Sequence, residues 1–108
     1  MKITDAEIPE IMQKIKKLQP KLSMLNLDRN QLKDEGAVTL ANALRGFHQL
    51  SQLSLQFNVI GREGAIALFS LKKEFTHLDI LFHGNKIQDV SEMDEIERIA
   101  NGQGKSLR

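Results

Sequence analysis

The sequence predicts an α/β protein, a short right-handed solenoid of about three strand–helix units behind an N-terminal capping helix. Two observations predict it: a 28-residue internal repeat, and a switch within each repeat from alternating apolar residues to helical apolar spacing. The chain has 108 residues, 41% hydrophobic and 27% charged, which suits one globular domain. Leu and Ile supply 25 residues between them (15 and 10), as expected for a core of aliphatic repeats.

The composition also excludes several classes of protein. The absence of Cys rules out a disulfide scaffold or a thiolate site, and the formal net charge of +1 argues against a nucleic-acid partner. No apolar run approaches the roughly 20 residues that span a bilayer. The N-terminus lacks the basic-then-apolar pattern of a secretory signal. We therefore expect a cytoplasmic protein without stable membrane association.

The repeat is clearest in residues 22–49 and 50–77, which align without gaps and are identical at ten of 28 positions. The identities fall at apolar, Ser, Asn, Glu and Gly positions. The identical pairs are Leu22/Leu50, Ser23/Ser51, Leu25/Leu53, Leu27/Leu55, Asn30/Asn58, Glu35/Glu63, Gly36/Gly64, Ala37/Ala65, Leu40/Leu68 and Phe47/Phe75. This concentration indicates a structural repeat, because chance identities would not gather at core positions.

A third, weaker copy follows, in which Ile80, Phe82, Asn85 and Ile87 repeat the spacing of the first unit. In the preferred frame His77 takes the leading Leu position and the second unit is one residue shorter. An alternative frame starts at residue 75 and inserts two residues before Asn85. The preferred frame divides the single domain into residues 1–21, 22–49, 50–76, 77–101 and a flexible tail, 102–108.

The pattern L-x-x-L-x-L-x-x-N-x-L, with Gly four residues further on, resembles the leucine-rich repeat family. The 28-residue period and the GA-x-x-L-A-x-x-L segment of residues 36–44 resemble its ribonuclease-inhibitor-like subtype, which also forms the sensing ends of NOD-like receptors. The resemblance covers residues 22–87 well and 88–100 loosely. It implies a parallel sheet backed by helices and a function in binding, without specifying the partner.

The N-terminal segment, residues 4–18, is predicted to be a capping helix. Thr4 or Asp5 can cap it, with Glu7 completing a capping box. An apolar stripe at helical spacing would cover the first repeat, and Pro20 ends the helix. The stripe consists of Ile8, Ile11, Met12, Ile15 and Leu18.

Within the repeats, the alternation of Leu25 and Leu27 predicts a short strand with one buried face, and helical spacing then follows. The helix faces are predicted as Val38, Leu40, Ala41 and Leu44 in the first unit, with Asp34 as cap, and Ile66, Leu68 and Leu71 in the second. Parallel strands require crossovers through these helices, and stacking buries both faces.

Polar and small residues at fixed positions should hold the turns. Asn30, Asn58 and Asn85 stand where the chain leaves each strand, so their amides are expected to bond unpaired backbone groups in a ladder. Gly36 and Gly64 are expected to allow helix and strand backbones to approach closely.

Residues 91–100 are predicted to form the last helix. Ser91 with Asp94 resembles a capping box, and Asn101-Gly102 is a helix stop. The inward face of this helix is predicted to carry Val90, Met93, Ile96 and Ile99.

The exposed face of the sheet is the predicted partner-binding surface. Its outward positions are Met24, Asn26, Asp28 and Arg29 in the first unit, Gln52, Ser54, Gln56 and Phe57 in the second, and Asp79, Leu81 and His83 in the third. Phe57 stands out, because a large apolar side chain at an exposed position invites a partner. The sequence therefore predicts a non-enzymatic protein-interaction module.

A metal-binding or hydrolytic protein is a weaker alternative. His77, Asp79 and His83 are close in sequence but supply too few ligands for a zinc site. The segment 102–106 ends like a phosphate-binding loop, yet Ile99 stands where that loop needs its first glycine. No nucleophile or metalloprotease motif is present. We therefore expect no catalytic residues and no cofactor.

A second alternative comes from an acidic cluster near the C-terminus: Glu92, Asp94, Glu95 and Glu97, with Leu107 second from the end. This arrangement resembles the glutamate-rich export signal of substrates of a bacterial type IV secretion system, among which small leucine-rich-repeat effectors are common. That resemblance implies an effector exported into a host cell and acting on a host protein. The structural interpretation of the cluster is a solvated helix face with acids near its N-terminus.

Overall fold

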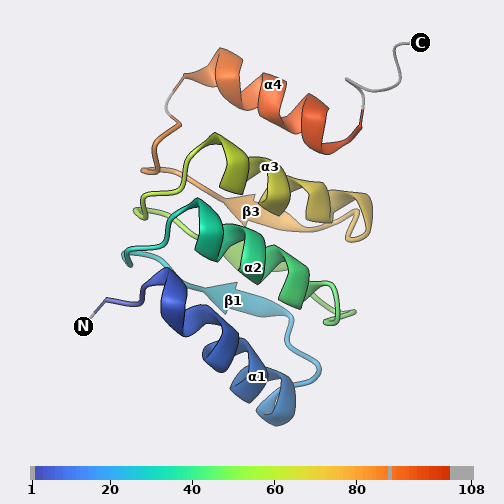
Figure 1. Ribbon diagram of the computed structural model, residues 1–108. Helices are drawn as coiled ribbons and strands as arrows, with labels where there is room; N and C mark the ends of the chain where they lie inside the picture. Colours follow the sequence, from blue (N-terminus) through green and yellow to red (C-terminus); the bar gives the residue numbers. More distant parts are fainter. Residues whose placement is uncertain (1, 88, 103–108) are drawn as a thin grey trace.

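The computed structural model describes residues 2–87 and 89–102, which form a layer of stacked helices lying against a parallel sheet (Figure 1). The helices and strands follow one another in the predicted alternation. In chain order they are η1 (Asp5–Glu7), α1 (Ile8–Leu18), β1 (Met24–Asn26), α2 (Asp34–Leu44), β2 (Gln52–Ser54), α3 (Arg62–Phe69), η2 (Ser70–Lys73), β3 (Asp79–Leu81) and α4 (Val90–Ala100).

The sheet has the strand order β1-β2-β3, and both pairs are parallel. Leu25 pairs with Leu53, and Leu53 pairs with Ile80. The sequence separation of the second pair is therefore one residue shorter than that of the first, as the preferred frame predicts. The leading apolar position, however, belongs to Leu78 (3% exposed) and not to the exposed His77. The missing residue therefore lies between Leu78 and Asp79.

The core is one continuous cluster of apolar side chains between the sheet and the helices. The inward strand residues Leu53 and Leu55 are fully buried, as are Leu40 and Leu68 from the facing helices. Alternating strand residues thus meet helical residues spaced by turns, which confirms that each unit buries its apolar face against its neighbours.

The three asparagines form the predicted ladder. Asn58 lies 6% exposed; its Nδ2 donates to the carbonyl of Leu27 at 2.9 Å and to that of Leu55 at 3.2 Å. Its Oδ1 accepts from the Leu32 N–H at 3.0 Å. Asn85 bonds in the same way, whereas the Asn30 Nδ2 donates only within its own turn and its Oδ1 accepts from the Ile3 N–H. Each asparagine therefore ties its own turn to the unit or segment before it.

Side chains, rather than strand backbones, lie nearest to the two helix glycines, and at each glycine one of these side chains is a carboxylate. The Asp34 Oδ1 accepts from the Gly61 N–H at 2.6 Å and from the Gly64 N–H at 3.2 Å. Asp34 therefore caps the following helix, α3, and the N-cap residue of its own helix is Lys33. The prediction that Asp34 caps its own helix is wrong because its side chain points along the stack. At Gly36, likewise, a Cβ would collide with the Asp5 carboxylate.

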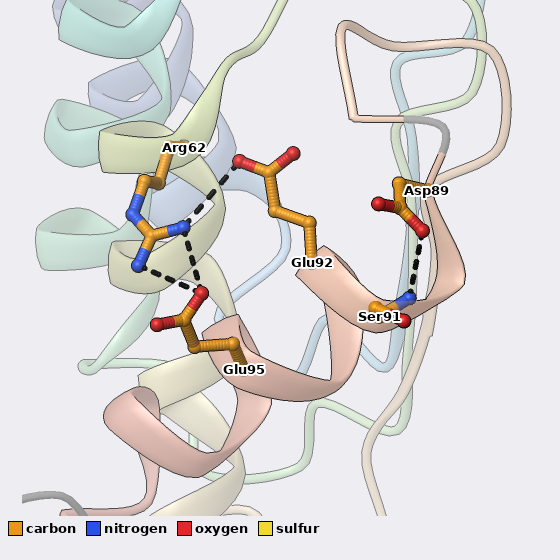
Figure 2. Close-up of polar contacts among 5 residues, drawn as sticks. All are labelled: Arg62, Asp89, Ser91, Glu92 and Glu95. Carbon is orange, nitrogen blue, oxygen red and sulfur yellow. Dashed lines mark hydrogen bonds and ion pairs between the residues drawn. The ribbon is translucent and has the colours of Figure 1, made fainter.

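The contact between α3 and α4 is made by ion pairs instead of a carboxylate that bonds backbone N–H groups. Arg62 occupies the position equivalent to Asp34, and its guanidinium pairs with Glu92 at 3.4 Å and Glu95 at 3.3 Å (Figure 2). The cap of α4 is Asp89, whose Oδ1 accepts from the Ser91 N–H at 3.0 Å, so the predicted Ser91–Asp94 capping box is wrong.

Two side chains predicted to face inward lie outside the core. Val90 is 75% exposed because it stands in the first turn of α4, and Leu18 is 78% exposed at the last residue of α1. The other residues of the two predicted apolar stripes face inward: Ile8, Met12 and Ile96 are buried, and Met93 and Ile99 are partly buried.

The two ends of the helix layer confirm further predictions. The Glu7 Oε1 accepts from the Thr4 N–H at 2.8 Å, the reciprocal contact of a capping box. Asn101 is the C-cap of α4, and Gly102 follows with a φ of 81°. The predicted tail and phosphate-loop residues 103–108 lie outside the described residues. Within the described residues, no helix is long and apolar enough to cross a membrane.

Candidate functional site: the exposed face of the sheet

The strand register brings the predicted surface residues into rows across the sheet. Met24 lies beside Gln52, which lies beside Asp79; Asn26, Ser54 and Leu81 form the next row. A hollow of about 230 Å³ lies over these rows, bordered by Met24, Gln56 and Leu81 among others. The structure therefore brings the three units into one surface, as the repeat predicts.

Part of this face is braced by Asp28 and is not free for a partner. The Asp28 Oδ1 accepts from the Ser54 hydroxyl at 2.6 Å and from the Gln56 N–H at 2.8 Å. Ser54 lies on the outer face, as predicted, but it is only 5% exposed and offers little surface to a partner. Because this carboxylate joins two strands, reversing its charge would disturb the face itself as well as any binding.

Phe57 is the most prominent aromatic side chain of the face, and it is 42% exposed. The Arg29 guanidinium carbon lies 4.6 Å from the centroid of its ring, and the His83 ring meets it edge-on at 5.6 Å. Each of the three units contributes one member to this cluster of Arg29, Phe57 and His83. The cation and the edge-on ring hold the phenyl group in one orientation.

The backbone beneath the cluster is left-handed. Arg29 and Phe57 both have a φ of 60°, and Gly84, the equivalent residue of the third unit, has a φ of 84°. A Cβ on Gly84 would lie 2.5 Å from the Phe57 ring, so the glycine makes room for the phenyl group. The sequence signal for this arrangement is the residue before each ladder asparagine: Arg29 and Phe57 were predicted as surface positions, whereas Gly84 was not.

The remaining positions differ in exposure. Met24 is 62% exposed at the edge strand, as predicted, whereas Gln52 and Leu81 are half-buried. The Asn26 side chain is turned back to accept from the Asp28 N–H at 2.9 Å. Met24 and the cluster around Phe57 are thus the apolar points of the surface.

The residues of the weaker metal hypothesis, His77, Asp79 and His83, are all exposed. Within residues 2–87 and 89–102, no three His, Asp or Glu side chains are grouped closely enough to hold a metal ion. His83 instead contacts the Phe57 ring, which gives it a place in the surface cluster.

Comparison with known families agrees with this architecture. A family model described as Leucine Rich repeat matches residues 19–41 and 48–69, of which the first contains β1 and most of α2 and the second contains β2 and α3. These matches support a leucine-rich repeat protein, and leucine-rich repeats generally mediate protein–protein interaction. No curated protein shows significant similarity to the chain.

Proposed function

We propose that this chain is a non-enzymatic protein-interaction module of the ribonuclease-inhibitor-like subtype, which binds a partner protein through the exposed face of its sheet. One observation carries this proposal: the Phe57 ring is held in place by Arg29 and His83, yet 42% of the residue remains exposed. A fixed aromatic ring loses little conformational entropy on binding, which is why such rings often dominate interface energies.

The cluster also indicates the chemistry of the partner. The exposed Arg29 guanidinium can donate to a carboxylate or a carbonyl, while the Phe57 ring and Met24 offer apolar contact. We therefore expect a protein surface with an apolar side chain beside an acceptor group. On the helix side, the Lys72 Nζ lies 6.0 Å from the centroid of the Phe69 ring and Phe69 meets Phe82 edge-on, but both rings are buried, so this second cluster offers no exposed aromatic ring.

The size of the face limits the affinity. Three strands at about 4.8 Å spacing span roughly 15 Å, and a standard interface takes about 800 Å² from each partner. The sheet face alone barely reaches that area. We therefore expect either modest affinity or participation in a larger assembly.

Affinity capture with the Phe57→Gly variant tests the proposal. Glycine suits the left-handed backbone at this position, as Gly84 shows, so the variant removes the ring without straining the turn. Val59→Ala is the matched control, because Val59 is also 42% exposed and lies two residues away. We expect Phe57→Gly to lose the captured partner and Val59→Ala to retain it. Equal capture by both variants would contradict the proposal.

The exported-effector alternative rests on the acidic cluster of the last helix. The structure engages Glu92 and Glu95 of that cluster with Arg62, a contact within the fold that explains them without an export receptor. We therefore favour the interaction module. Fusion of residues 92–108 to a neutral carrier, followed by an export assay, tests the alternative: transfer of the carrier would support it, and retention would exclude it.

A further inference from the structure

The contacts between repeats follow one backbone scheme, which points to a second binding surface at the C-terminal end. The first unit bonds the second through backbone N–H groups and one carbonyl along their boundary. The N–H groups of Leu27, Arg29 and Leu32 donate to the second unit at 2.8 to 3.0 Å, and the Leu32 carbonyl accepts from it at 2.9 Å.

The second unit repeats the scheme toward the third. The N–H groups of Leu55, Phe57 and Ile60 donate at 2.8 to 3.0 Å, and the Ile60 carbonyl accepts at 3.0 Å. In both interfaces the third donor bonds the Oδ1 of the following ladder asparagine. The scheme is therefore a property of the repeat and not of one pair of strands.

In the third unit the equivalent donors are Phe82, Gly84 and Ile87. Within residues 2–87 and 89–102, none of these three N–H groups donates a hydrogen bond. They lie along the edge of β3 that faces away from β2, because β2 already bonds the carbonyls of Leu81 and His83. An edge strand with unpaired donors is a template for pairing with another chain.

A cavity with a largely apolar lining lies beside this edge. Its volume is about 720 Å³, and its apolar lining comes from α3, β3, the segment after β3 and α4: Phe69, Ile80, Phe82, Ile87, Val90 and Met93. Lys72, Asp94 and Glu97 also border it. The equivalents of Ile80 and Ile87 in the second unit, Leu53 and Ile60, are fully buried because the third unit covers them. Backbone donors and a cavity for apolar side chains thus occur together at this end.

We infer that this edge binds an extended segment of a partner protein, running parallel to β3 and following the pattern of apolar, any, apolar, any, any, Asn. The two apolar side chains would enter the cavity, as Ile80 and Phe82 lie against the second unit. The asparagine Oδ1 would accept from the Ile87 N–H, as those of Asn58 and Asn85 do from Leu32 and Ile60. Main-chain pairing supplies affinity and the pockets supply specificity.

An extended segment without a preceding helix fits this edge better than a second copy of this chain does. At the opposite end Ile3 alone supplies the backbone partners of the first ladder asparagine and the residue after it: its N–H donates to the Asn30 Oδ1 at 2.8 Å and its carbonyl accepts from the Gln31 N–H at 2.9 Å. A second copy placing β1 beside β3 would bring its α1 into the space of α4, because α1 precedes β1 in the helix layer (Figure 1).

The test uses the full chain and a labelled peptide with the sequence of residues 50–60, LSQLSLQFNVI, flanked by lysines for solubility. We expect binding by fluorescence anisotropy, together with slower amide exchange at Phe82, Gly84 and Ile87. A peptide with Ala in place of its Asn should bind about tenfold more weakly, since it loses the hydrogen bond to Ile87.

Two protein variants locate the site. Val90→Glu places a charge at the mouth of the cavity on a residue that is 75% exposed, so the fold is kept and binding should be lost. Met24→Glu makes the same change at an exposed residue of the opposite edge strand and should leave binding unchanged. Failure of the peptide to bind at millimolar concentration, equal binding of the Asn and Ala peptides, or loss of binding only in Met24→Glu would overturn the inference.

Discussion

The two ends of this stack differ in how completely their cores and sheet edges are covered. At the N-terminal end, Ile3 satisfies the ladder of the first unit, and α1 covers the core with the fully buried Ile8. At the C-terminal end, α4 covers part of the core with Ile96, yet the Ile87 N–H has no partner within the described residues. A helix alone can cover apolar surface, but the edge of a sheet also needs backbone partners.

The helix layer shows the same contrast. Between the early helices, a carboxylate bonds backbone N–H groups: Asp5 bonds Lys33 at 2.8 Å, and Asp34 bonds Gly61 at 2.6 Å. Between α3 and α4, the half-exposed Arg62 forms ion pairs with acidic side chains. We therefore expect substitutions in the first part of the stack to cost more stability than equivalent substitutions near the last helix.

The largest effect is expected from removing a ladder asparagine between two full units. Asn58→Ala leaves the buried Leu32 N–H and the Leu27 carbonyl without their side-chain partner, which should cost about 3 kcal/mol of unfolding free energy. Urea denaturation measures it. Asn42→Ala is the control: Asn42 is exposed on α2, and its substitution should cost less than about 0.5 kcal/mol. Similar losses in both variants would contradict the ladder.

A smaller loss is expected from Gly64→Ala. The added Cβ would lie 2.6 Å from Ile60 Cγ2 and 2.9 Å from Ala37 Cβ, so packed atoms must move, at a cost of about 2 kcal/mol. Gly46→Ala is the matched control, because the nearest atom to its Cβ is the Lys16 Nζ at 3.7 Å. Thermal denaturation of both variants tests this, and an unchanged melting temperature for Gly64→Ala would show that α2 and α3 pack more loosely than described.

The smallest effects compare two equivalent positions directly. Asp34→Ala removes the cap of α3 and should cost about 1 kcal/mol. Arg62→Ala removes only half-exposed ion pairs and should cost less than about 0.5 kcal/mol, with most of that lost in high salt. Denaturation of both variants at low and high salt separates the two contributions. A larger loss for Arg62→Ala would reverse the comparison between the two parts of the stack.

Local patterns predicted the repeat, the strand register and the asparagine ladder, because these depend on residues that recur every 27 or 28 positions. Errors arose where a side chain acts on a neighbouring unit. Asp34 caps the next helix and Asp28 braces the next strand, and no local pattern distinguishes these roles from ordinary caps and surface charges. Val90 was predicted to face inward, but helical periodicity does not show that a residue in the first turn of α4 is left 75% exposed.

Amide hydrogen exchange of the native chain tests the difference between the two ends most directly. Leu32, Ile60 and Ile87 are equivalent donors, of which the first two are bonded by an asparagine. We predict that the Leu32 and Ile60 amides exchange only through extensive unfolding and that the Ile87 amide exchanges at least about 100-fold faster. Equal protection of all three amides would mean that the C-terminal edge is already paired, and would contradict an open end.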